Sequence, residues 1–167
     1  GSLVVDDRYR NEWRGTVGGD WMDPANWSFG WLPGADEKVV LKAGAKAVVP
    51  EDTGAFGQLL VEEGATLVQS NWTSRVRADE IVVNGTVTTF GSFTNDAPQA
   101  RVWLTCRDLT VGATGAIDVD GKGWSGGRYA GGQRPGCGPG ASAMSCGAAH
   151  GGCGSMTVVG RSIGKVY

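Results

Sequence analysis

The sequence has little net charge, no long apolar run and a single histidine. The formal net charge is −2 and charged residues make up 19% of the chain, so nothing draws it generally to nucleic acid or to an anionic membrane. No apolar run approaches the roughly 20 residues that a membrane-spanning helix needs. The one histidine, His150, is flanked by Ala-Ala and Gly-Gly. We expect it to form a local hydrogen bond rather than to serve in a Ser-His-Asp triad.

Four cysteines are present, at Cys106, Cys137, Cys146 and Cys153. An even number of cysteines, three of them in a glycine-rich segment, predicts two disulfides and an oxidising compartment. Of the three possible connectivities we favour Cys137–Cys146 with Cys106–Cys153. Zinc is the alternative interpretation, but the spacings match no standard zinc finger.

A short pattern repeats along the middle of the chain. Leu59–Leu67 reads as an apolar run, a small polar turn with glycine, and a second alternating apolar pair. The pattern recurs in weaker form at Val39–Val48, Ile81–Val87 and Leu109–Ile117. A period of about 20 residues that tolerates insertions is typical of a solenoid, and the short alternating segments predict strands, so we expect a parallel β-helix. Because Asn84-Gly85 is also a hairpin signal, an antiparallel β-sandwich is the alternative.

The first 35 residues differ from the rest of the chain. Trp13, Trp21, Trp27 and Trp31 lie close together among frequent turn signals such as Asp23-Pro24. We expect residues 1–35 to form a tryptophan-rich cap over the open end of the solenoid, since terminal repeats are usually atypical. In the functional interpretation, Trp21 and Trp31 bind sugar rings by stacking.

The remaining residues, 36–167, are predicted to form the coils of the solenoid. A glycine-rich insertion at 121–154 has almost no apolar side chain to bury, so we expect its cysteines to hold it together. After it, Met156-Thr-Val-Val returns to the strand pattern. We expect the chain to be a fragment of a larger protein.

Charged residues on the predicted strands offer two candidate sites. Arg75, Arg77 and Arg101 alternate with apolar residues and are predicted to form an anion-binding stripe on the outer face. Asp118 and Asp120 alternate on one strand face. With carbonyl oxygens of the glycine-rich loop they could hold calcium, or they could act as the acid and base of a glycosidase. A solvated strand edge is the simpler explanation of both sets.

Two segments resemble parts of known proteins. Gly19-Asp-Trp21, Asn26-Trp-Ser28, Pro33-Gly-Ala-Asp36 and Val39-Val-Leu resemble the N-terminal segment of large secreted or surface β-helix proteins, including autotransporter-like adhesins. This match covers about 25 residues. Ile117-Asp-Val-Asp-Gly-Lys-Gly with Ala148-Ala-His-Gly-Gly152 is similar to glycine-rich loops of very large extracellular proteins, over about 40 residues. The resemblance implies a right-handed β-helix outside the cell, and it carries over no catalytic residue.

We therefore expect a non-catalytic, extracellular or cell-surface β-helix module for adhesion, glycan contact or a structural stalk. The first alternative is a polysaccharide lyase or glycoside hydrolase acting on a polysaccharide, either acidic or neutral. The second is a self-assembling fibre or sheath component that associates end to end through open strand edges. We expect no cofactor apart from calcium, no nucleic-acid partner and no membrane insertion.

Overall fold

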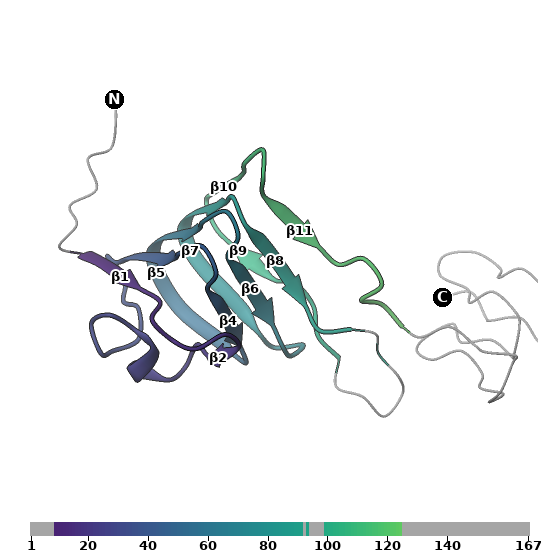
Figure 1. The fold of residues 1–167 in the computed structure, drawn as a ribbon, viewed down its shortest axis with the longest axis horizontal. Coiled ribbons are helices and arrows are strands. Elements are labelled where there is room, and N and C mark those ends of the chain that lie inside the picture. The colour runs from purple at the N-terminus through teal and green to yellow at the C-terminus, as the bar shows by residue number, and fades with distance from the viewer. Residues whose placement is uncertain (1–8, 92, 94–98, 125–167) are drawn as a thin grey trace, which may run out of the picture. The chain divides into compact units, whose positions relative to one another are not determined.

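The computed structural model describes residues 9–91, 93 and 99–124 (Figure 1). The chain divides into two compact units. The first comprises Gly1–Phe90 and Ala100–Val119, and the second comprises Gly91–Gln99 and Asp120–Tyr167. Nearly all the described residues belong to the first unit, which contains every named strand.

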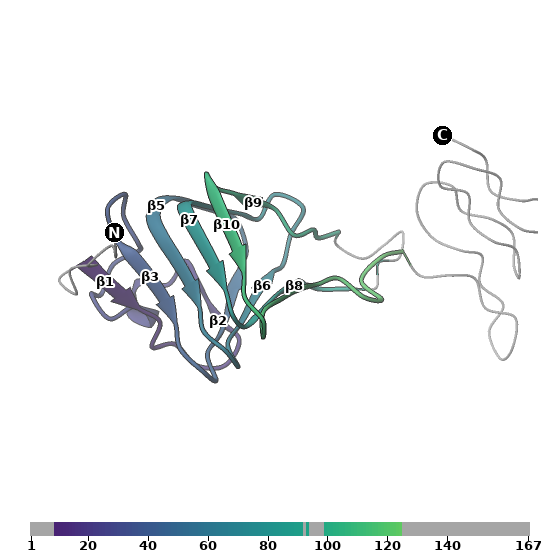
Figure 2. The same cartoon turned by 90° about the horizontal axis from the view of Figure 1, so that it is seen from above.

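The first unit contains two parallel sheets. The first sheet has the strand order β1-β3-β5-β7-β10, and β9 also pairs with β7. Its strands are β1 (Arg10–Glu12), β3 (Lys38–Leu41), β5 (Asp52–Val61), β7 (Arg75–Val83), β9 (Leu104–Thr105) and β10 (Asp108–Val111). Figure 2 shows β3, β5, β7 and β10 side by side with their arrows pointing the same way.

The second sheet has the order β11-β8-β6-β4-β2. Its strands are β2 (Gly19–Asp20), β4 (Lys46–Val49), β6 (Thr66–Gln69), β8 (Thr86–Thr89) and β11 (Ala116–Asp118). The chain alternates between the two sheets, except that β9 is followed by β10 of the same sheet. Each inner strand of these orders pairs with the equivalent strand of the preceding and following passes.

Glycines make the turns between the two sheets. Gly44 and Gly64 have φ angles of 81° and 78°, a region of backbone conformation that glycine adopts without the steric cost of a side chain. At Gly85 the constraint is space, because a Cβ there would overlap the carbonyl oxygens of Glu62 and Ala65. These turns keep successive strands in register.

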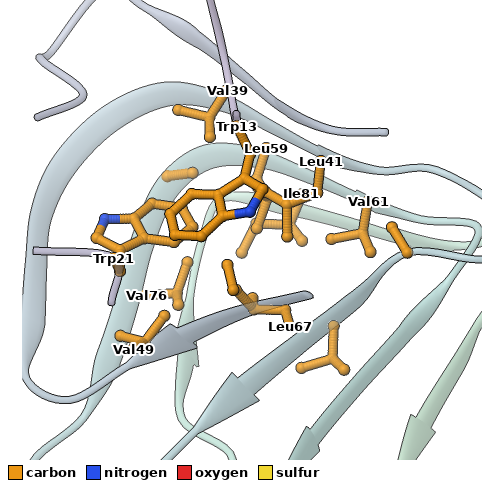
Figure 3. Packing of buried hydrophobic residues seen from close by; sticks show 14 of the residues in the cluster. Trp13, Trp21, Val39, Leu41, Val49, Leu59, Val61, Leu67, Val76 and Ile81 are labelled. Carbon is orange, nitrogen blue, oxygen red and sulfur yellow. The ribbon is translucent and has the colours of Figure 1, made fainter. Parts of the chain in front are cut away.

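The core consists of apolar residues that lie in columns across neighbouring strands (Figure 3). Val39, Leu59 and Ile81 are partners in the register of β3, β5 and β7, and all three are fully buried. Ala47, Leu67 and Val87 form the equivalent buried column in the second sheet. The alternation of these residues with polar ones explains why the segments form strands with one buried face.

The segment before β3 adds three buried tryptophans to this core. The Trp27 ring makes edge-on contacts with Trp13 and Trp21, at centroid distances of 5.2 and 4.6 Å. The ring of Trp21 also stacks on Phe56 of β5 at 5.9 Å. A short 3₁₀ helix, η2 (Pro24–Asn26), lies in this segment, and Asp23 caps it by accepting a hydrogen bond from Ala25 N–H at 2.9 Å.

Few residues of the second unit are described. Within it, Phe93 N–H donates to the Gly123 carbonyl oxygen at 2.9 Å. The Phe93 ring meets Trp124 edge-on at a centroid distance of 6.1 Å. The rest of the predicted glycine-rich insertion, from residue 125 onward, lies outside the described residues, as does His150.

These observations correct the fold class predicted from the sequence, a right-handed β-helix with a disulfide-stapled loop. The structure shows two parallel sheets with almost no helix among the described residues. The stapling is unsupported, because Cys106 is a free thiol. The alternative of an antiparallel sandwich is also wrong, since every pairing between named strands is parallel. Asn84-Gly85, a hairpin signal in the sequence, instead connects β7 of one sheet to β8 of the other.

Candidate ligand-binding surface

Two arginines of β7 bind one carboxylate of β5. Arg75 lies opposite Asp52 in the register of the two strands, and its Nε donates to Asp52 Oδ2 at 2.8 Å. Arg77 Nε donates to the other oxygen, Oδ1, at 2.9 Å. Partial burial raises the pKa of Asp52, but hydrogen bonds from Arg75 and Gly54 N–H and the charges of both arginines outweigh it. The pKa is therefore held below its usual value.

A third arginine, Arg101, packs against two indole rings. Its Cζ lies 4.0 Å from the ring centroid of Trp103 and 4.5 Å from that of Trp72. Arg101 Nε also donates to the Trp72 carbonyl oxygen at 3.0 Å. The Cζ of Arg75 lies 4.7 Å from the same Trp103 ring. We call Trp72, Arg75, Arg101 and Trp103 the arginine–tryptophan cluster.

A buried amide positions Trp103. Gln69, at the end of β6, is fully buried. Its Oε1 accepts a hydrogen bond from Trp103 N–H at 2.7 Å, and its Nε2 donates to the Trp103 carbonyl oxygen at 3.0 Å. The same carbonyl accepts from Val76 N–H at 3.0 Å. A buried amide that uses both its donor and its acceptor on one backbone residue fixes the position of that residue.

The turn that carries Trp72 is anchored in the same way. Ser74 is fully buried. Its Oγ donates to the Val49 carbonyl oxygen at 2.8 Å and accepts from Asn71 N–H at 2.9 Å. The Asn71 side chain donates to the Pro50 carbonyl oxygen at 2.7 Å. The backbone around Trp72 is thus fixed, while 51% of the Trp72 residue remains exposed.

Positive charge is in excess around the cluster. Asp52 is shared by Arg75 and Arg77. Within the described part of the chain, no carboxylate lies within ion-pair distance of Arg101. The Nη groups of Arg101 are not buried without a hydrogen-bond partner. They remain in contact with solvent. The arrangement offers a half-exposed indole beside guanidinium N–H donors.

The two tryptophans predicted to bind sugar have different environments. Trp21 is fully buried and presents no ring face to a ligand. Trp31 is 56% exposed, its Nε1 donates to Glu37 Oε1 at 2.8 Å, and its ring lies 5.3 Å from that of Phe29. None of these contacts of Trp31 involves the three arginines predicted to bind anions.

The structure brings those three arginines together. Arg75 and Arg77 share Asp52, and Arg75 and Arg101 share the Trp103 ring. The predicted anion-binding stripe is therefore a local group in which two of the three charges share one carboxylate.

Within the described part of the chain, the aspartates predicted to hold calcium belong to no group of acidic side chains that could hold a metal ion. Asp118 is the last residue of β11, and its backbone carbonyl oxygen accepts from Thr88 Oγ1 at 2.6 Å. Asp120 belongs to the second unit. Among residues 9–91, 93 and 99–124, no group of three or more His, Cys, Asp or Glu side chains is placed to hold a metal ion.

The cysteine prediction is only partly covered by the described residues. Cys106 is half-buried beside the core and is a free thiol, so the structure gives no support to the predicted bond to Cys153, which lies outside the described residues. Burial, and secondly the charge of Asp108, raise the pKa of this thiol. Cys137, Cys146 and Cys153 lie outside the described residues.

Four residues of this surface were missed from the sequence, namely Asp52, Gln69, Trp72 and Trp103. Arg101 and Trp103 are two residues apart, a spacing that places them on one face of an extended segment. That spacing was the one available signal. The contributions of Asp52 and Gln69 depend on pairing with residues 23 and 34 positions away, which no local pattern reveals.

Comparisons of the chain with protein-family models, with curated proteins and with solved structures found no match. No helix among the described residues is long and apolar enough to span a membrane.

Proposed function

We propose that this protein is a non-catalytic, extracellular module that contacts glycans through the arginine–tryptophan cluster. The observation that carries the proposal is the contact of Arg101 with both Trp72 and Trp103, next to an indole that is half exposed. An indole face suits the apolar C–H face of a sugar ring, and adjacent N–H groups can donate to its hydroxyl oxygens.

The backbone anchoring of the cluster supports a binding role. Gln69 fixes Trp103, and Ser74 fixes the turn of Trp72. A ligand that stacks on such a surface does not have to order it, which lowers the entropic cost of binding. The long side chain of Arg101 is likewise restrained by its bond to the Trp72 carbonyl oxygen.

The state of Asp52 favours binding over glycoside hydrolysis at this surface. A general acid for glycoside cleavage needs a raised pKa near the operating pH. The pKa of Asp52 is lowered, and its two oxygens already accept hydrogen bonds from Arg75, Arg77 and Gly54. Asp52 is therefore a poor proton donor and a poor base.

The test is a glycan array probed with the wild-type protein and with Trp72→Ala. We expect Trp72→Ala to reduce binding by about fivefold or more, since stacking on an aromatic ring is worth about 1 kcal/mol or more. Trp31→Ala is the matched control, because Trp31 is similarly exposed but outside the cluster.

Unchanged binding by Trp72→Ala would contradict the assignment of the site. Circular dichroism and the melting temperature of each variant show whether the fold is retained.

A further inference from the structure

The charge of the cluster indicates which glycans it would bind. The cluster contributes the guanidinium groups of Arg75 and Arg101, and Arg77 lies beside it; among the described residues, the carboxylate in ion-pair contact with these arginines is Asp52. Two of them donate to that carboxylate, so their charges are partly neutralised. Arg101 has no such partner within the described part of the chain, and its Nη groups contact solvent.

Arg101 is also held in a fixed orientation. Its Nε is engaged by the Trp72 carbonyl oxygen at 3.0 Å, and its guanidinium packs on the Trp103 ring at 4.0 Å. The two Nη groups remain as a planar pair of donors. That geometry matches the two oxygens of a carboxylate, which arginine binds through two parallel hydrogen bonds.

We propose that the ligand is an acidic polysaccharide whose uronate carboxylate binds the Nη groups of Arg101 while a sugar ring stacks on Trp72. This inference rests on the proposed function and specifies the ligand class of the same site. A uronate has its carboxylate attached directly to the pyranose ring, so one residue, or two adjacent ones, can reach both groups. The Cζ of Arg75 lies 4.7 Å from the centroid of the same Trp103 ring, so its charge adds to the positive field.

The experiment compares matched pairs of oligosaccharides by isothermal titration calorimetry. Mannuronate, galacturonate and glucuronate oligomers are each paired with the neutral oligomer of the same linkage and length, and dextran sulfate is a separate arm. We expect at least one uronate to bind more tightly than its neutral partner, and this preference to weaken with added salt.

The variants are Arg101→Gln, Arg101→Lys and, as control, Arg107→Gln. Loss of a charge-assisted hydrogen bond is expected to reduce uronate affinity about ten- to a hundredfold in Arg101→Gln. Arg101→Lys keeps the charge but loses the planar fork, so we expect an intermediate loss. Arg107 has a side chain that is 74% exposed, bound to Asp108 and outside the cluster, so Arg107→Gln should bind as the wild type does.

The possible failures are distinguishable. If neutral and uronate oligomers bind equally and Arg101→Gln has no effect, while Trp72→Ala abolishes binding, the acidic ligand is overturned and the glycan-binding function stands. A preference for dextran sulfate over every uronate overturns the assignment to a carboxylate. If no glycan binds, the proposed function fails and this inference fails with it.

Discussion

Asp52 determines how the positive charge of the candidate surface is distributed, because it accepts hydrogen bonds from both Arg75 and Arg77. With this carboxylate present, Arg101 is the arginine left to meet a ligand. The lowered pKa of Asp52 also links this surface to the stability of the fold.

A pKa that is lower in the folded state than in the unfolded state contributes stability above the unfolded value, and this stability is lost as the pH falls through the folded value. We therefore expect Asp52→Asn to lower the melting temperature by a few degrees at neutral pH. The difference should shrink as the pH falls below about 4, near the ordinary pKa of an aspartate.

The measurement is the melting temperature of both proteins across this pH range. Glu12, whose pKa is also lowered, chiefly by its hydrogen bond with Lys42, is present in both proteins and cancels in the comparison. A difference that stays constant with pH would show that Asp52 does not titrate as described.

The sequence could not distinguish a buried tryptophan from an exposed one. The residues that follow Trp21 and Trp72 in the sequence do not indicate which ring is buried. Trp21 is nevertheless fully buried, whereas Trp72 is half exposed. The difference arises because Trp21 stacks on Phe56, a residue 35 positions away, whereas the turn of Trp72 is held by Ser74. Burial of a large side chain depends on such distant contacts.

At the scale of the strands, one apolar position recurs in different surroundings. Leu59, Ile81 and Leu109 are partners in the register of β5, β7 and β10. Leu59 is fully buried between β3 and β7, whereas Leu109 is 46% exposed. Replacing leucine by alanine at positions 59 and 109 therefore compares how much the burial of this side chain stabilises each strand.

We expect Leu59→Ala to reduce the free energy of unfolding by about 2–5 kcal/mol, because it removes buried methyl groups and leaves a cavity. Leu109→Ala should cost only about 1 kcal/mol, since about half of that side chain already contacts water. Urea denaturation of the two variants gives both values.

Each variant is the control for the other, because the substitution is the same. Equal losses would contradict the exposed position of Leu109.

The repeated segments predicted the strands of both sheets well, because alternation of apolar residues is a local property. Their turns were less predictable. In the register, residues 62–65 occupy four positions between Val61 and Thr66, whereas residues 84–85 occupy two between Val83 and Thr86. Gly44 and Gly64 therefore occupy equivalent positions in their turns, whereas Gly85 lies one position closer to the strand that follows. Glycines of similar spacing thus have different roles, a positive φ in one case and lack of space in the other.

The first unit as a whole is held together by contacts between successive passes of the chain. Strands β5 and β7 have a neighbouring strand on each side, whereas β10 and β11 each pair with a single described strand. The side chains of β10 and β11 are also exposed, including Leu109, Val111 and Ile117. Stability in such an arrangement is distributed unevenly, and local opening is easiest where fewest apolar contacts are made.

We expect native-state hydrogen exchange to show this gradient. The amides of β5 and β7 should exchange only with global unfolding, whereas those of β10 and β11 should exchange at least about tenfold faster through local opening. Uniformly slow exchange across all four strands would mean that β10 and β11 have further partners, either in the chain beyond the described residues or in another molecule. Repeating the measurement at several protein concentrations separates these two cases, because only the second depends on concentration. Protection of β10 and β11 that rises with concentration would give the predicted end-to-end association a physical basis in the apolar residues of these two strands.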